Sequence, residues 1–180
     1  NLEVDFMEIV PIFADQITAF RYGNDQPDEF SRLFSQWQDP EYLFTFFTEH
    51  SKDLQSGFFG NIAVSVAVRQ TRDEARRLEQ KLRQLSPHDL DSAFEPLQLN
   101  EPHELARSKA TGHRHKSWLR VYAIQLEANA YVVTGGAIKL TRSMQERAHT
   151  AAELNRFERC KAFLREQGIT DVDGLKELIL

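Results

Sequence analysis

The sequence contains a single cysteine, Cys160, among its 180 residues. One thiol cannot form a disulfide within the chain, which excludes the cross-linked scaffolds of small secreted proteins. No stretch has the apolar length of a membrane-spanning helix or the layout of a secretory signal, so we expect a cytoplasmic protein that makes no membrane contact. A chain of this length buries a core without cross-links, and we expect one domain over residues 1–180. We also expect Met7 to be the natural first residue, with a tag remnant at 1–6.

Basic residues are scarce at the start of the chain and concentrated later. Residues 1–50 contain two Lys or Arg against ten Asp or Glu, whereas residues 101–150 contain eight against four. The net charge of −5 argues against a generally basic nucleic-acid binder, but an average can conceal a local cationic surface. Cationic side chains on sheet strands suit a polyanion better than a metal or an apolar ligand. We therefore expect the function to reside in residues 101–150.

Apolar periodicity predicts a hairpin followed by helices in the first half of the chain. The hairpin covers about residues 7–22 and turns at 14–16. An i, i+3, i+4, i+7 pattern from Phe30 to Trp37 predicts a helix that opens near Asp28, and Asp39-Pro40 supplies the N-cap and first residue of a second helix. A long helix then runs from about residue 63 to Pro87, followed by a short helix or turn at 90–94.

The second half of the chain predicts strands and then helices. Strands are expected near 104–109, 117–127 and 131–140, a helix from His149 or Thr150 to Gly168, and a short helix over 172–180. The 117–127 strand is apolar on both faces and is expected to be central. Gly135-Gly136 interrupts the third strand, which indicates a bulge or a place where another backbone comes close. The predicted fold is α+β, with a small antiparallel sheet of three to five strands packed against helices.

The order of these elements resembles a known family. A long helix, a basic strand, the strand Ser117-Trp118-Leu119-Arg120-Val121-Tyr122, a hairpin, the run Gly135-Gly136-Ala137-Ile138-Lys139-Leu140-Thr141-Arg142 and a polar helix are similar to the core of the RelE/HigB/ParE bacterial toxins. The resemblance covers roughly residues 63–167, in a RelE-like core of 61–168 that follows an N-terminal extension of 7–60 and precedes a short C-terminal helix at 169–180. This chain departs from the family in being acidic, in its extra N-terminal residues, and in lacking a K-K-T pair after the glycines.

The resemblance implies the toxin component of a type II toxin–antitoxin system. It implies an endoribonuclease that cleaves mRNA at the ribosome, with a helix-turn-helix antitoxin as partner and no cofactor or metal. The 2′-hydroxyl would attack the adjacent phosphorus, which needs cations beside the developing charge and a group to move protons. The implied catalytic residues are Lys139, Arg142, Arg120 and His149. The implied nucleic-acid-binding residues are Arg107, Lys109, Arg114, Lys116 and Arg147.

Structural readings of the same residues stay open. Arg120 could pair with a core carboxylate such as Glu127 or Glu95, and Lys139 and Arg142 could form a solvated strand end. The His113-Arg114-His115 run reads more readily as a polar loop than as a zinc site. A binding module that holds RNA, DNA or an acidic protein without cleavage is therefore the alternative to an enzyme.

The acidic N-terminal extension suggests a role as an internal antitoxin. We expect its hairpin and helices to pack against the sheet and to restrict access to the basic face. The alternative is that they only enlarge the core.

Overall fold

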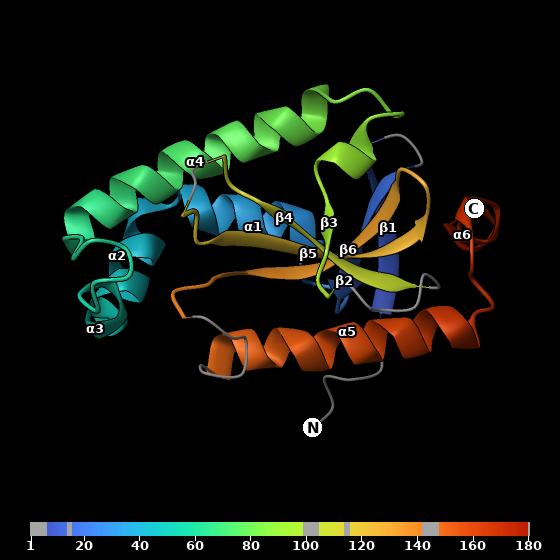
Figure 1. The fold of residues 1–180 in the computed structure, drawn as a ribbon. Helices are drawn as coiled ribbons and strands as arrows, with labels where there is room; N and C mark the ends of the chain where they lie inside the picture. The colour runs from blue at the N-terminus through green and yellow to red at the C-terminus, as the bar shows by residue number, and fades with distance from the viewer. Residues whose placement is uncertain (1–6, 14–15, 99–104, 114–115, 142–147, 180) are drawn as a thin grey trace.

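The computed structural model describes residues 7–13, 16–98, 105–113, 116–141 and 148–179 (Figure 1). The fold is α+β. Within these residues, six strands form one mixed sheet in the order β1-β2-β6-β5-β4-β3. The strands are β1 (Met7–Phe13), β2 (Ile17–Tyr22), β3 (Glu95–Pro96), β4 (Ala106–Thr111), β5 (Leu119–Glu127) and β6 (Ala130–Ile138). The helices are α1 (Glu29–Gln38), α2 (Pro40–Glu49), α3 (Ser51–Leu54), α4 (Val64–Gln84), α5 (Ala148–Glu166) and α6 (Val172–Ile179), with a 3₁₀ turn at Leu90–Ser92.

The prediction of an antiparallel sheet of three to five strands is wrong. The N-terminal hairpin adds two strands to the sheet, because Ile17–Ala19 of β2 pair in parallel with Tyr131–Val133 of β6. All other neighbouring strands are antiparallel. The hairpin itself was predictable from local alternation, whereas its parallel pairing joins segments more than a hundred residues apart and leaves no local pattern.

Helices cover both faces of the sheet (Figure 1). One core cluster packs α1, α2 and α4 against side chains such as Val121 and Val133, and the other packs α5 and α6 against side chains such as Tyr122 and Val132. Figure 1 shows α4 and α5 on opposite sides of the sheet. The alternating apolar residues of β5 supply both clusters, which confirms that this strand is central.

The predicted helix starts are confirmed. The Asp28 carboxylate accepts a hydrogen bond from Ser31 N at 2.9 Å and caps α1. Asp39 caps α2 through Glu41 N at 3.0 Å, with Pro40 in the first turn. These caps satisfy amide groups that a helix leaves unpaired at its start, and their signals are local in the sequence.

The predicted bulge is confirmed beside the glycine pair in β6, whereas a close backbone is found only at Gly136, from the paired strand, and the other close groups are side chains. The register of β5 and β6 shifts opposite Tyr122 and Ala123, which leaves Thr134 as the extra residue of a bulge. A Cβ atom on Gly135 would overlap the carboxylate of Glu153 on α5. A Cβ atom on Gly136 would lie 2.6 Å from the Arg120 carbonyl oxygen and 2.7 Å from a Leu33 methyl. The missing side chains therefore let α5 and α1 approach the two faces of this strand closely.

The N-terminal helices do not cover the face on which the basic strand residues lie. Arg107, Lys109 and Arg120 pair with Ile124, Tyr122 and Ala137, whose side chains belong to the α5 cluster, so the basic residues share the α5 face. Helices α1 and α2 pack on the opposite face. The expected shielding of the basic face by the N-terminal helices is thus wrong, because helix α5 occupies that position.

Among the described helices, none combines the length and the apolar composition that crossing a membrane requires.

Candidate active site

A cleft opens beside β6 where β2 leaves it. The described pairing of β2 with β6 ends at Val133, and the edge of β6 beyond that point forms one wall of a cleft of about 640 Å³. Helices α1 and α2 line the cleft on one side and α5 on the other. This volume lies within the range of small-ligand pockets. The lining residues are Arg32, Leu33, Gln36, Trp37, Tyr42, Phe46, Glu49, His50, Gly136, Ala137, Ile138, Ala148, His149, Ala152, Glu153 and Arg156.

Two arginines and two carboxylates form a network at this cleft. The buried carboxylate of Glu29 accepts hydrogen bonds from Arg156 Nη1 at 2.5 Å and from Arg32 Nη2 at 3.1 Å, with a further short contact to Arg32 Nε. Arg156 Nη1 also donates to Glu153 Oε1 at 3.4 Å. These bonds link α1 to α5 across the open edge of β6. The side chains of Arg32 and Arg156 stay 28 and 26 % exposed, so both cations remain accessible from solvent.

Arg156 keeps donors for a ligand. Only its Nη1 donates to a described residue, and its guanidinium lies 4.7 Å from the centre of the Tyr22 ring. The Tyr22 hydroxyl is itself fixed by bonds to the Thr134 carbonyl at 2.6 Å and to Cys160 Sγ at 3.1 Å. A planar guanidinium held on a ring face presents its remaining N–H groups in a fixed direction.

Glu153 is the most perturbed carboxyl at the cleft. Its side chain is buried, and its Oε2 atom has no hydrogen-bond partner among the described residues. Burial is the main cause that raises the pKa of Glu153 to about 7, and the nearby Glu29 carboxylate adds to it, while Arg156 and Arg32 oppose it. A carboxyl group that titrates near neutral pH in a cleft is a candidate general base or acid.

Two histidines stand at the other end of the cleft. The His50 ring stacks on Phe46 with centroids 4.2 Å apart, and the His149 ring meets His50 edge-on at 5.1 Å. His50 Nδ1 bonds the Phe46 carbonyl at 2.8 Å, and His149 Nε2 bonds the Ile138 carbonyl at 3.0 Å. Because a carbonyl only accepts, both of these nitrogens carry the proton. His50 Nε2 bonds no described residue and is left to exchange a proton in the cleft.

Local sequence explains how α5 and α1 present these groups. His149, Glu153 and Arg156 are spaced by four and three residues, which places them on one face of a helix. Arg32 follows Glu29 by three residues on α1, in the same relation. The buried position of Glu153 depends on Gly135, because any side chain there would occupy its space.

The structure brings only part of the predicted catalytic set to this cleft. His149 lines it. Arg120 lies on the α5 face, half-buried, and its Nη1 donates to the carbonyls of Ser117 at 2.7 Å and Leu119 at 2.9 Å rather than to Glu127 or Glu95. Lys139 follows Ala137 by two residues, and its backbone N–H bonds the Trp118 carbonyl at 2.7 Å. Strand alternation therefore places Lys139 on the face of Arg120. Arg142 lies outside the described residues.

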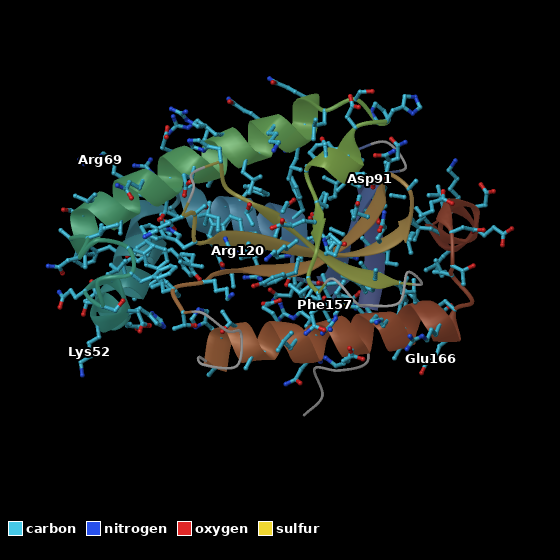
Figure 2. The ribbon with its side chains drawn as sticks, in the orientation of Figure 1. Lys52, Arg69, Asp91, Arg120, Phe157 and Glu166 are labelled. Carbon is cyan, nitrogen blue, oxygen red and sulfur yellow. The ribbon has the colours of Figure 1, made fainter. Side chains whose placement is uncertain are left out.

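The predicted nucleic-acid-binding residues are dispersed. The Arg107 guanidinium lies 5.9 Å from the Phe157 ring between the sheet and α5, where Figure 2 marks Phe157. Lys109 Nζ is 3.7 Å from Glu95 Oε1. Lys116 Nζ donates to the Phe58 carbonyl at 3.1 Å, beside α3. Arg114 and Arg147 lie outside the described residues.

Sequence reasoning missed Glu29, Arg32, His50, Glu153 and Arg156. Their spacings within each helix are those of ordinary surface ion pairs, so nothing local marked them as parts of one site. The glycine pair was a partial signal, since it predicted a nearby backbone, whereas the groups that meet Gly135 are the side chains of Glu153 and Arg156. In the described residues, no group of three or more His, Cys, Asp or Glu side chains is arranged to hold a metal ion.

Comparisons with protein-family models, with curated proteins and with solved structures gave no significant match to this chain.

Proposed function

We propose that the protein is an endoribonuclease that cleaves RNA in the cleft between α1, α2 and α5. The observation that carries the proposal is that the Glu153 carboxyl, whose pKa burial raises to about 7, lines the same cleft as two partly exposed arginines. A base, cations and a second proton-transfer group are what cleavage by a neighbouring 2′-hydroxyl requires.

Each group has a role in this reaction. Ionised Glu153 takes the proton of the 2′-hydroxyl, whose oxygen attacks phosphorus. The free N–H groups of Arg156, with Arg32 beside them, hold the phosphate and stabilise the negative charge that develops on its oxygens. Protonated His50 gives its Nε2 proton to the 5′-oxygen as the P–O5′ bond breaks. The products are a 2′,3′-cyclic phosphate and a 5′-hydroxyl.

The cleft also offers a surface for a base. Tyr42, Phe46 and His50 line the α2 side, opposite Glu153 and Arg156 on α5. Aromatic side chains stack with unpaired bases and are the usual means by which proteins hold single-stranded RNA. A nucleotide with its phosphate on the arginines and its base on the α2 wall fits this division of the cleft.

The direct test is cleavage of a labelled mRNA by the purified protein, with and without ribosomes. Glu153→Gln should lower the rate by about a hundredfold or more, the usual contribution of a general base. The matched control is Glu158→Gln, an exposed acid on the same helix, which should leave the rate unchanged. With Glu153 as base and His50 as acid, the pH–rate profile should be bell-shaped, and its rising limb, which reports Glu153, should lie near pH 7. Full activity of the Glu153 variant, or products without a cyclic phosphate, would refute the assignment.

The biological role that we propose is that of a toxin in a type II toxin–antitoxin system, acting in the cytoplasm and neutralised by a partner antitoxin. Induced expression should then arrest growth, and Glu153→Gln should relieve the arrest. Arrest that persists with the Glu153 variant would separate toxicity from cleavage in this cleft.

A binding module that does not cleave RNA is the second candidate. The register places Arg107, Lys109 and Arg120 on one face of the sheet, which α5 also covers, so such a module would use the parts of these side chains that α5 leaves exposed. The double variant Lys139→Ala with Arg142→Ala should then bind nucleic acid more weakly, and neither it nor the wild-type protein should show cleavage. Detection of specific cleavage would decide against this candidate.

A further inference from the structure

The outer side of α4 carries a row of arginines that the proposed reaction does not use. Arg69, Arg72, Arg76 and Arg83 are all exposed. With 3.6 residues per turn, they fall within an arc of about 60° and extend over about 21 Å. We call these four residues the arginine stripe. Figure 2 shows Arg69 on the outer side of α4.

The stripe is opposite the buried side of its helix. Ala67, Thr71, Ala75, Leu78 and Leu82 face the core, and the arginines are centred about 130° around the helix from them. All four side chains are therefore exposed, although Arg72 and Arg83 also contact the protein.

Two of the four arginines are unpartnered. In the part of the chain that the structure describes, Arg69 and Arg76 make no hydrogen bond or ion pair. The other two are anchored by one side only: Arg72 Nε donates to the Gln38 carbonyl at 3.0 Å, and Arg83 lies 4.7 Å from the Phe13 ring and 3.9 Å from Glu79. The acidic chain thus presents a row of available cations on one helix.

Helix α1 lies between the stripe and the cleft. Arg32 and Gln36 of this helix line the cleft. The other side of the helix lines a separate groove of about 430 Å³, together with Glu79 and Arg83 of α4. The exposed Ser31 and Ser35 lie along that groove, together with Asp39 at one end. Crossing α1 is a path of about one helix diameter, 10–12 Å.

We infer that the arginine stripe binds the phosphate backbone of the RNA strand whose scissile nucleotide occupies the cleft. The charges are complementary, the row is long enough for several successive phosphates, and the small hydroxyl side chains on α1 leave the path between the two sites open. Backbone contacts of this kind hold a strand without reading its sequence. The choice of RNA as the ligand rests on the proposed function.

The test measures affinity for a short 2′-O-methyl RNA, which cannot be cleaved because its 2′-oxygen is blocked. Arg69→Gln with Arg76→Gln removes two phosphate contacts. For a single strand, the slope of log K against log salt should become shallower by about 1.4, and binding at 0.1 M salt should weaken about 25-fold. The matched control is Lys52→Gln with Arg165→Gln, which removes two exposed charges from other helices.

The two proposals fail separately. If the stripe variant binds the RNA with the same affinity and the same salt slope as wild type, the inference is wrong. This holds even if the stripe is later found to bind an acidic protein. An equal loss in the control variant would also overturn it, because the effect would then follow net charge alone. If the wild-type protein binds RNA through the stripe but never cleaves it, the proposed reaction fails and the stripe assignment stands.

Discussion

Replacing Glu153 by glutamine should change how the stability of the protein depends on pH. The pKa of Glu153 is raised from an ordinary value of 4.5 to about 7 by burial. Between these values the folded state holds a proton that the unfolded state has lost, so folding becomes less favourable as the pH rises. The cost is absent below about pH 4.5 and complete above about pH 7.

The size of this effect follows from the pKa difference. At 1.36 kcal/mol per pH unit, the ionised Glu153 lowers the free energy of unfolding by about 3 kcal/mol above neutral pH. Glutamine at this position is neutral at every pH and carries no such cost. The stability of Glu153→Gln relative to wild type should therefore increase by about 3 kcal/mol between pH 4.5 and 8. Any loss of the weak bond to Arg156 shifts the whole curve without changing this trend.

Denaturant unfolding of both proteins across this pH range measures the difference directly. Groups that titrate alike in the two proteins cancel, which leaves the contribution of residue 153. Glu158→Gln, which changes an exposed acid, should give a flat difference. If the stability of Glu153→Gln relative to wild type stays flat or falls as the pH rises, the pKa of Glu153 is not raised by burial. The basis for its role as a base would then be removed.

Two further predictions concern contacts that hold the site and the sheet. Gly135→Ala should destabilise the protein by about 1–3 kcal/mol, because the new methyl group meets the Glu153 carboxylate. In a Glu153→Ala background most of this loss of stability should disappear. If the two losses simply add in a double-mutant cycle, the contact is contradicted. Asp91→Ala should lower the free energy of unfolding by about 3 kcal/mol, because Asp91 Oδ1 accepts hydrogen bonds from Tyr131 Oη at 2.6 Å and from Asn129 N at 2.9 Å. Asp91→Asn keeps an acceptor and should lower it by less than half as much in the same unfolding assay.

The sequence predicted those parts of the fold whose signals are local. Asp28 and Asp39-Pro40 marked the starts of two helices, because capping involves residues only two or three positions apart. Gly168 ended α5, with a backbone φ of +68° that glycine adopts readily. Alternation along β5 correctly indicated a strand buried on both faces. Each of these features depends on a window of a few residues.

The position of the hairpin and the content of the site were not predictable in this way. Pairing of Ile17–Ala19 with Tyr131–Val133 depends on tertiary packing that no short window encodes. Glu153 and Arg156 look like a solvent-exposed pair on a polar helix, and Glu29 and Arg32 look the same. They become one buried network only because α1 and α5 meet at the edge of β6.

The glycine pair in β6 is a local sequence signal that marks a tertiary contact. Sequence alone indicated a bulge or a nearby backbone at Gly135-Gly136, and it assigned the function of that place to the cationic residues that follow. In the structure, the glycines instead leave space for two side chains. The Glu153 carboxyl lies against Gly135 on one face of β6, and Leu33 lies against Gly136 on the other. Because β2 has already left β6 at this point, the same stretch of strand is open at its edge, and the groups from α1 and α5 converge there rather than over the basic strands. The chemistry of the site thus depends on a carboxyl that the glycines keep out of water, with arginines close enough to bind an anion beside it.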